Sequence, residues 1–164
     1  MYTRTIGFFV TAALAAAKKS NGDVCRALVL SGGGNNGAWE VGVLHGLLNN
    51  GNESDFAYDV VTGVSAGAIN TTAMAGWPMG DEKALADWLS DLWLNLHTSD
   101  VWQDWRLGKA QGFLNKGGVV DNSPLLAYLR DTLAPYNKTG YQRRVTISSV
   151  EVDTGVTQNS IRKI

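Results

Sequence analysis

The hydrophobic positions of the chain first form two short apolar runs, each followed by an apolar stretch with helical spacing. Residues 26–30 (Arg-Ala-Leu-Val-Leu) predict a buried strand, and apolar side chains then recur at helical spacing over residues 38–48. A second, β-branched run at residues 60–62 (Val-Val-Thr) precedes small apolar residues over 68–75, which predict a buried helix. Because consecutive strands joined through a helix usually lie side by side and parallel, the pattern predicts an α/β fold.

The second half of the chain continues with helices and ends in two strands. A helix is expected from Asp81, which is placed to cap it, to about His97, because six apolar residues form one broad face: Leu85, Trp88, Leu89, Leu92, Trp93 and Leu96. A further helix is expected over residues 124–133, ended by Pro135. Strands are expected over 143–150 and 156–161, joined by a hairpin turn at 153–155.

The N-terminal 25 residues have a different pattern from the rest. A basic start is followed by an apolar run at residues 6–17 that ends in Ala15-Ala-Ala17 and then by two lysines, which is typical of a secretory signal peptide. We therefore expect residues 1–17 to be a signal peptide, residues 18–25 a short mature tail, and the protein to be secreted or lumenal. Two sequons, at Asn52 and Asn137, lie in expected loops and are candidate glycosylation sites, whereas Asn70 is expected to be too buried.

Composition limits the classes of protein that need to be considered. The 164 residues are 45% hydrophobic and 18% charged, which suits one globular domain, and the net charge of −1 gives no reason to expect a nucleic-acid partner. Cys25 is the only cysteine, so a disulfide within the chain and a cysteine-based zinc site are excluded. With two histidines in addition, no metal site is expected.

The most informative stretch joins the second strand to its helix. Residues 63–67 read Gly-Val-Ser-Ala-Gly, a G-x-S-x-G sequence between an expected strand and an expected helix, which is the context of a nucleophile elbow. In such a turn Ser65 is exposed, the flanking Gly63 and Gly67 avoid clashes between strand and helix, and the helix N-terminus faces any developing oxyanion. We therefore predict that Ser65 is a nucleophile and that the backbone N–H of Ala66 contributes to an oxyanion hole.

The glycine-rich turn after the first strand is the second candidate element. Residues 31–37 read Ser-Gly-Gly-Gly-Asn-Asn-Gly, and Gly32, Gly34 and Gly37 also satisfy the G-x-G-x-x-G pattern of dinucleotide sites. A dinucleotide site of this kind requires an acidic residue at the end of the next strand to bind the ribose, but this chain has Thr62-Gly63 and the serine turn there. The dinucleotide interpretation is therefore the weaker one. The alternative is an oxyanion hole, in which the N–H groups of Gly32, Gly33 and Gly34 point at a carbonyl oxygen beside Ser65.

These two motifs, in this order and at this spacing, resemble the patatin-like phospholipase family. The resemblance is carried by residues 31–44 and 59–70 and extends from about residue 26 to the end of the chain. It implies a three-layer α/β/α sandwich with a mostly parallel sheet, a lipid or phospholipid substrate met at a membrane surface, and hydrolysis of acyl esters by a Ser–Asp dyad without cofactor, metal or nucleotide. By motif match, Ser65 would be the nucleophile and Gly32, Gly33 and Gly34 the oxyanion loop.

The chain departs from the family pattern in two places. Asn36 stands where the family usually has Arg or Lys, which changes the local charge but not the backbone donors of the loop. The family's catalytic aspartate stands in an Asp-Gly-Gly or Asp-Gly-Ala turn, and neither sequence occurs here. Asp121 is expected to make a turn or to cap the helix that follows, and Asp153 is expected in a hairpin turn. We therefore expect residues 26–164 to be an incomplete acyl hydrolase domain, with an inactive lipid-binding form or fragment as the alternative and a nucleotide-binding domain as a weaker one.

The remaining candidate residues lie between these two halves. The Trp-rich helix of residues 81–97, with Trp102 and Trp105 after it, is expected to cover the sheet, or alternatively to contribute to an acyl-chain channel or an interfacial surface. His97 could in principle act as a general base, but the sequence indicates no carboxylate partner for it. His45, one position past Leu44 in the first expected helix, is no stronger a candidate for that role. An exposed, helix-terminal role is expected for His97.

Overall fold

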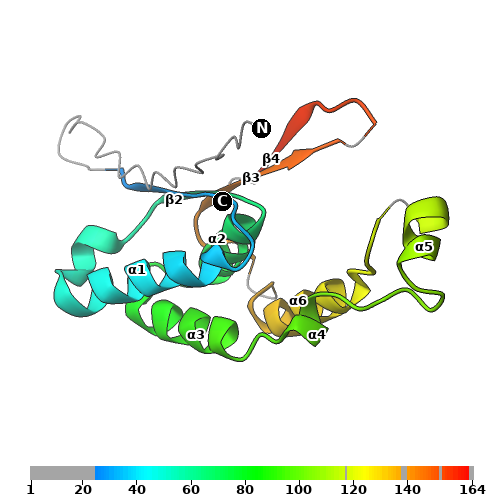
Figure 1. Cartoon of the computed structure of the whole chain (residues 1–164). Helices are drawn as coiled ribbons and strands as arrows, with labels where there is room; N and C mark the ends of the chain where they lie inside the picture. The colour runs from blue at the N-terminus through cyan, green and yellow to red at the C-terminus, as the bar shows by residue number, and fades with distance from the viewer. Residues whose placement is uncertain (1–24, 117, 138–139, 152, 163–164) are drawn as a thin grey trace, which may run out of the picture.

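The computed structural model describes residues 25–116, 118–137, 140–151 and 153–162 of the chain. Its strands form one four-stranded sheet in the order β1-β2-β3-β4, with β1 Ala27–Leu30, β2 Val60–Val64, β3 Arg144–Val150 and β4 Thr157–Arg162 (Figure 1). β2 pairs in parallel with both β1 and β3, whereas β3 and β4 form an antiparallel hairpin. The prediction of an α/β fold with a mostly parallel sheet is confirmed.

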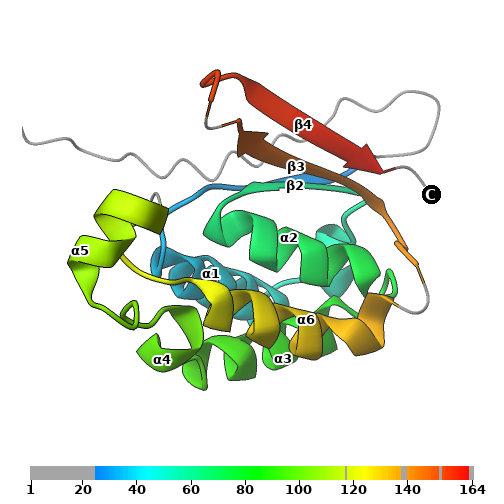
Figure 2. The same cartoon turned by 90° about the vertical axis from the view of Figure 1, so that its right-hand side faces the viewer.

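The helices lie on one side of this sheet (Figures 1 and 2). They are α1 Asn36–Asn50, α2 Ala66–Gly76, α3 Glu82–Leu94, α4 Thr98–Val101, α5 Lys109–Gln111 and α6 Ser123–Asn137, with a 3₁₀ helix η1 at Glu53–Phe56 and a π-helical turn η2 at Gly112–Lys116. α2 lies directly under the strands, and α1, α3 and α6 lie below it. In the described residues, two layers of the expected three-layer sandwich are present, namely the sheet and the helices on one of its faces.

Helix α2 is the centre of the domain. It packs against β1, β2 and β3 on one side and against α1, α3 and α6 on the other. Eight of its eleven residues are buried: Ala66, Gly67, Asn70, Thr71, Ala73, Met74, Ala75 and Gly76. A helix enclosed on all sides is apolar or small all round rather than amphipathic, which explains why the sequence of α2 consists mostly of Ala, Gly and Thr.

A buried ion pair fixes β3 to the connection between α2 and α3. Arg143 and Glu82 are 0% and 1% exposed in their side chains, and Arg143 Nη1 lies 3.0 Å from Glu82 Oε1. The guanidinium also donates to the backbone carbonyls of Tyr58, Trp77 and Pro78. Burial lowers the pKa of Arg143, and the charge of Glu82 opposes this shift. The pair is therefore held by nearly full hydrogen bonding of both charges.

Two predicted helix ends were wrong. α3 ends at Leu94 rather than near His97, because Asn95 N–H closes the last turn onto Asp91 O at 3.0 Å and the chain then starts the new helix α4. Asp81 stands at the N-cap of α3 but accepts no capping hydrogen bond with its side chain. α6 continues through Pro135 to Asn137, because a proline in the last turn removes one N–H donor but keeps a helical φ.

The three sequons lie in different kinds of environment. Asn52 lies in an exposed connection, Asn70 is fully buried as expected, and Asn137 is the last residue of α6 rather than part of a loop. Glycosylation of Asn52 and Asn137 stays a prediction. The expected signal peptide, residues 1–17, lies outside the described residues. Among the described helices, none combines the length and apolar character that crossing a bilayer requires.

Candidate active site

Ser65 occupies the turn between β2 and α2. Its backbone has φ 54° and ψ −123°, which makes it the one non-glycine residue with positive φ in the described part of the chain. Such a conformation costs on the order of 1–3 kcal/mol and persists only where the surrounding structure enforces it. The Ser65 carbonyl accepts the N–H of Ala68 at 2.9 Å, so the residue caps α2 and its exposed side chain stands at the positive end of the helix.

The glycines on either side of Ser65 allow the strand and the helix to approach closely. Gly67 N–H donates to Ser31 O at 3.2 Å, and a Cβ added to Gly67 would lie 2.5 Å from that same oxygen. A Cβ added to Gly63 would meet the Gly67 carbonyl oxygen and the Thr71 hydroxyl. Backbone atoms cannot move aside as flexible side chains do, so this turn requires glycine at both positions.

The glycine loop from Ser31 to Asn35 faces the serine turn. A Cβ added to Gly32 would lie 3.0 Å from Ser65 Cβ, which shows how closely the two backbones approach. Gly34 has φ +60°, and its carbonyl accepts the N–H of Gly37 at the start of α1. Within the described ranges, the N–H groups of Gly33, Gly34 and Ala66 donate to no protein acceptor. These donors are available beside Ser65, and their oxyanion role stays a prediction.

A buried polar network supports this loop from behind. Glu40 Oε1 accepts the N–H of Ser31 at 2.8 Å, and Glu40 Oε2 accepts Asn70 Nδ2 at 3.2 Å. The Asn70 amide also donates to Gly37 O at 3.1 Å, and its Oδ1 accepts Trp93 Nε1 at 2.8 Å. Asn70 is 0% exposed and Glu40 7% exposed. The network therefore joins the end of β1, α1, α2 and α3 directly behind the candidate oxyanion loop.

The carboxyl group of Glu40 is sensitive to its surroundings. Burial raises the pKa of Glu40, while the hydrogen bonds from Ser31 and Asn70 favour the charged form and oppose the shift. A buried carboxylate with fewer donors would take up a proton more readily. The two donors thus offset part of the cost of desolvating a charged carboxylate at this position.

Gly37 connects the loop to this network. A Cβ added to Gly37 would meet the ring of Trp93 and would lie 3.0 Å from Ala66 Cβ. Glycine at this position lets α1 approach both α2 and α3 where the serine turn begins. Gly37, the last glycine of the glycine-rich turn, therefore has a packing role: it makes room for Trp93 and Ala66.

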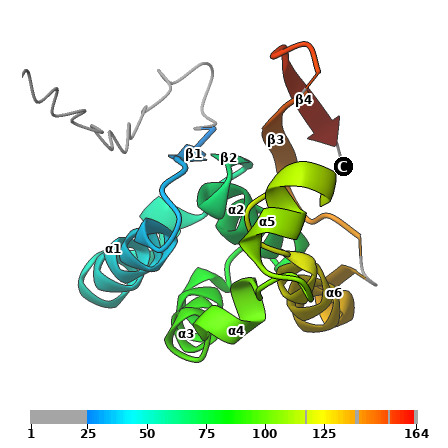
Figure 3. The same ribbon diagram turned by 45° about the vertical axis from the view of Figure 1, so that its right-hand side comes forward.

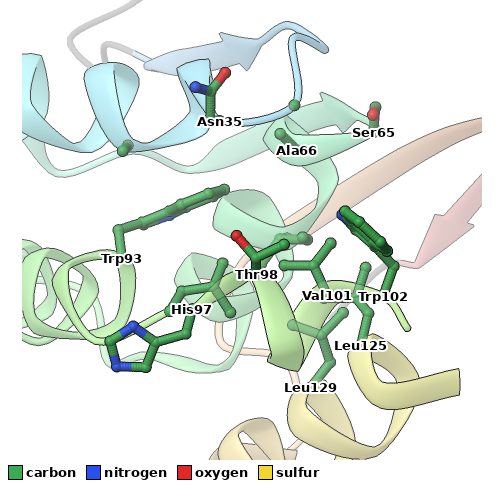
Figure 4. A pocket seen from close by; sticks show the side chains of 14 residues that line it. Asn35, Ser65, Ala66, Trp93, His97, Thr98, Val101, Trp102, Leu125 and Leu129 are labelled. Carbon is green, nitrogen blue, oxygen red and sulfur yellow. The ribbon is translucent and has the colours of Figure 1, made fainter. Parts of the chain in front are cut away.

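A pocket of about 550 Å³ extends from Ser65 between the helices (Figure 4). Its walls are mostly apolar and come from the glycine loop and α1, from α2, from the end of α3 with α4, and from α6. The residues that line it are Gly34, Asn35, Ala38, Ser65, Ala66, Ile69, Trp93, Leu96, His97, Thr98, Val101, Trp102, Leu125 and Leu129. Its size and lining suit a largely apolar small molecule. The expectation that the Trp-rich helix covers the sheet was wrong, because α3, which carries Trp93, packs on α1 and α2 rather than directly on the sheet.

The other candidate residues are engaged away from Ser65. The ring of His97 lies across the pocket and turns away from Ser65 (Figure 4), and its backbone N–H donates to Asp100 at 2.9 Å. His45 pairs with Asp87 at 3.0 Å on the surface. Asp121 accepts hydrogen bonds from Gln103 Nε2 and the Ser123 N–H, which lower its pKa, and so makes the turn before α6, one of the two expected roles.

Asp153 is exposed in the turn between β3 and β4, as expected. In the part of the chain that the structure describes, the Ser65 hydroxyl forms no hydrogen bond with a carboxylate or an imidazole. No group of three potential metal ligands among His, Cys, Asp and Glu occurs in the same ranges.

Sequence reasoning missed the polar network and the far wall of the pocket. Glu40 could have been noticed, because it shares the helical face of Gly37, Val41 and Leu44, where a charge needs a buried partner. The contributions of Val101, Leu125 and Leu129 had no sequence signal, since they depend on where α4 and α6 pack.

The fold and the site together define an α/β protein that presents a serine on a strained strand-to-helix turn, opposite a glycine loop and at an apolar pocket. The family model of patatin-like phospholipases matches residues 28–163. The chain therefore belongs to the patatin-like phospholipase family. No curated protein and no solved structure matches it. Membership in this family points to lipid substrates and to lipid acyl hydrolase activity.

Proposed function

We propose that the protein is a lipid acyl hydrolase of the phospholipase A type with Ser65 as its nucleophile. The observation that carries this proposal is the position of Ser65, on a turn with positive φ, next to Gly32 and at the apolar pocket. Strain of this kind is retained where the geometry is useful, here by exposing the hydroxyl at a helix N-terminus.

The reaction follows from the groups around Ser65. The hydroxyl oxygen attacks the ester carbonyl carbon, and the N–H groups of Gly33, Gly34 and Ala66 hold the oxygen that becomes negative. The tetrahedral intermediate collapses to an acyl-serine and releases the alcohol, which takes up a proton. Water then attacks the acyl-serine and releases the fatty acid. None of these steps requires a metal, a nucleotide or another cofactor.

No general base for Ser65 is identified among the described residues, because no carboxylate or imidazole there is hydrogen-bonded to its hydroxyl. The family's Ser–Asp dyad implies an aspartate, but Asp121 and Asp153 have other positions, as described above. By resemblance to the family, the proton of Ser65 would go to an aspartate in an Asp-Gly-Gly or Asp-Gly-Ala turn, and neither turn occurs among the 164 residues. In the absence of that group, slow acylation by a reactive probe is still expected from the turn and the oxyanion donors alone.

The pocket supports an acyl chain as the group that is recognised. Its walls offer aliphatic and aromatic carbon from Ile69, Leu125, Leu129 and Trp102, with few polar groups. An acyl chain in this pocket would place its ester near Ser65 and leave the polar head group outside. The residues Asn35 and Thr98 are the polar side chains at the pocket that could contact the ester region.

Labelling with a serine-directed fluorophosphonate tests the assignment. We expect covalent labelling of the wild-type protein at Ser65 and release of alcohol from a short-chain p-nitrophenyl ester, and neither with Ser65→Ala. Ser31→Ala is the matched control, because Ser31 lies beside the same loop but its hydroxyl faces Gly32 O. Equal labelling of Ser65→Ala and wild type would exclude Ser65 as the nucleophile.

A second candidate function is lipid binding without catalysis. It is favoured by one observation, namely that the Ser65 hydroxyl has no carboxylate or imidazole partner among the described residues. This candidate predicts retention of a fluorescent fatty acid in the pocket together with no repeated turnover of an ester, even where a reactive probe slowly acylates Ser65. Release of several alcohol molecules per protein molecule would exclude it.

We also propose that the protein enters the secretory pathway through residues 1–17 and that the hydrolase domain begins near residue 26. N-terminal sequencing of protein secreted from a eukaryotic host is expected to begin at or close to Lys18. A mature protein that starts at Met1 would contradict the signal-peptide assignment.

A further inference from the structure

Residues 105–116 form a small projection from the helical layer, which we call the Trp105 projection. It contains α5 and η2 and lies at one end of the helical side, apart from α1 and α3 (Figures 1 and 2), and in the view of Figure 3 it comes forward in front of α2. The chain enters it after Gln103 and returns at Asp121. These two residues exchange backbone hydrogen bonds of 2.9 Å in both directions, and Gln103 Nε2 donates to Asp121 Oδ2 at 2.9 Å. The projection is therefore tied together at its base.

Trp105 holds the projection in shape from inside. Its Nε1 donates to Gly118 O at 2.9 Å, and Gly112 is buried against its ring, where an added Cβ would overlap the indole. Gly108 N–H donates to Trp105 O at 2.7 Å, and Lys116 Nζ lies 5.8 Å from the ring centroid. The large aromatic residue is thus used for internal packing, which leaves the other apolar residues of the projection facing outward.

Three large apolar side chains of the projection are almost fully exposed. Leu107, Phe113 and Leu114 are 75%, 78% and 75% exposed, and they occur within eight residues of sequence. Apolar side chains concentrated at such exposure indicate an interaction site rather than ordinary surface composition.

Basic residues accompany these apolar side chains. Arg106, Lys109 and Lys116 are all exposed, and residues 105–116 contain no Asp or Glu. Asp104 stands directly before these residues, so residues 104–116 carry a net charge of +2, whereas the whole chain carries −1. Exposed aromatic and aliphatic side chains interspersed with Lys and Arg are the combination that binds the interface of anionic membranes.

The projection is continuous with the pocket. Trp102, directly before its base, lines the pocket and is 40% exposed, and Leu125, shortly after its base, lines the same pocket. A lipid surface that contacts Phe113 and Leu114 would therefore lie on the same side of the domain as the Trp102 wall of the pocket.

We propose that the Trp105 projection docks the protein onto lipid surfaces that contain anionic phospholipids, with Leu107, Phe113 and Leu114 in the interface and the three basic residues on the head groups. This proposal deepens the proposed function by assigning the element that brings the pocket to its substrate. It does not depend on turnover, because docking requires the projection and not Ser65.

Vesicle flotation tests the docking directly. The probes are vesicles of phosphatidylcholine alone and of phosphatidylcholine mixed with phosphatidylserine. Wild-type protein is expected to float with the mixed vesicles and much less with the neutral ones. The double variant Phe113→Asp/Leu114→Asp is expected to bind the mixed vesicles at least tenfold more weakly, since it removes two apolar anchors and adds two negative charges.

Two further variants separate the contributions. The triple variant Arg106→Gln/Lys109→Gln/Lys116→Gln is expected to reduce binding to the mixed vesicles to the level seen with neutral ones. Leu94→Asp is the matched control, because Leu94 is 79% exposed but ends α3 outside the projection, and it should bind as wild type does. Urea unfolding midpoints close to that of wild type would show that all variants are folded.

The outcomes distinguish docking from catalysis. Fluorophosphonate labelling of Ser65 in solution is expected to be the same in the double variant and in wild type. Equal flotation of the double variant and wild type would overturn the docking proposal, whatever the labelling shows. If wild type is a dimer, the double variant is a monomer and neither floats, the projection contacts a second copy of the chain and the docking proposal is overturned. Flotation without labelling would uphold docking and refute the proposed hydrolase.

Discussion

The network behind the glycine loop gives a sharp prediction for Asn70→Asp. This change keeps the oxygen that accepts Trp93 Nε1 and replaces the amide nitrogen, which donates to Gly37 O at 3.1 Å and to Glu40 Oε2 at 3.2 Å, by a second carboxylate oxygen. Two acidic groups then share a site that is fully buried at Asn70. Like charges in such a site are expected to bind one proton between them.

The size of the effect is set by whichever of two free-energy costs is smaller, the repulsion between two charged carboxylates or the protonation of one of them. Two unit charges about 3.2 Å apart repel by about 5 kcal/mol at an effective dielectric constant of about 20. Protonating the new carboxyl instead costs about 1.4 kcal/mol for each pH unit above about 3.9, which is about 4 kcal/mol at pH 7 and about 1.5 kcal/mol at pH 5. The protonated group can again donate to Glu40, so protonation is favoured, with a further cost of about 1 kcal/mol for the hydrogen bond lost at Gly37.

The sign of the pH dependence is therefore fixed. The new carboxyl has a raised pKa in the folded state, so its destabilising effect is small near its ordinary pKa and grows as the pH rises. We expect Asn70→Asp to lower the free energy of unfolding by about 5 kcal/mol at pH 7 and by about 2.5 kcal/mol at pH 5, relative to wild type at the same pH. A loss of this size is comparable with the whole stability of many domains.

Urea unfolding followed by tryptophan fluorescence at pH 5, 6 and 7 measures this difference. Asn70→Ala is the matched control, because it removes all three hydrogen bonds without adding a charge and should cost about 4 kcal/mol. Its cost should rise less between pH 5 and pH 7 than that of Asn70→Asp, because it only removes one donor that holds down the pKa of Glu40. Wild type is measured at each pH because the raised pKa of Glu40 gives it a pH dependence of its own. A pH-independent difference between Asn70→Asp and wild type would refute the reasoning.

Two other changes test strain and the buried ion pair. Ser65→Gly should be more stable to thermal unfolding than Ser65→Ala by about 1 kcal/mol, because glycine relieves the cost of φ 54° while alanine retains it, and equal melting temperatures would mean that the turn is unstrained. Arg143→Leu should lower the urea unfolding free energy by about 3–5 kcal/mol, because it leaves Glu82 buried without its cation, whereas the exposed neighbour Arg144→Leu should change it by less than about 0.5 kcal/mol.

The parts of the fold that the sequence predicts well are those whose cause is local. Residues 60–67 encode both a β-branched strand and the glycines that a close strand-to-helix turn requires, so the position of Ser65 between β2 and α2 could be read directly. The order of strands and helices then implies a parallel sheet. The helix ends at Leu94 and Asn137 were less accessible. α3 closes its last turn with the hydrogen bond from Asn95 N–H to Asp91 O before His97 is reached, and the fixed φ of Pro135 is compatible with the last turn of α6.

The parts that escaped prediction depend on contacts between distant residues. Glu40 and Asn70 are separated by thirty positions, and their pairing is decided by how α1 packs on α2. The same holds for the pocket, where Trp102 and Leu129 face Ser65 only because α4 and α6 pack below α2. Periodicity identifies which face of a helix is apolar, but it does not identify the partner of that face.

The central position of β2 also has a consequence for synthesis of the chain. β2 is completed by its pairing with β3, which begins about 80 residues later, and α2 is enclosed only when α6 and β3 are present. A ribosome that adds about 5–20 residues per second needs several seconds to make that stretch. During this interval β2, the strand that leads into Ser65, has a neighbouring strand on one side only, with an open edge towards solvent. Nascent chains of this protein are thus exposed to mispairing just where the serine turn is being built, and chaperones that shield strand edges would act in that window.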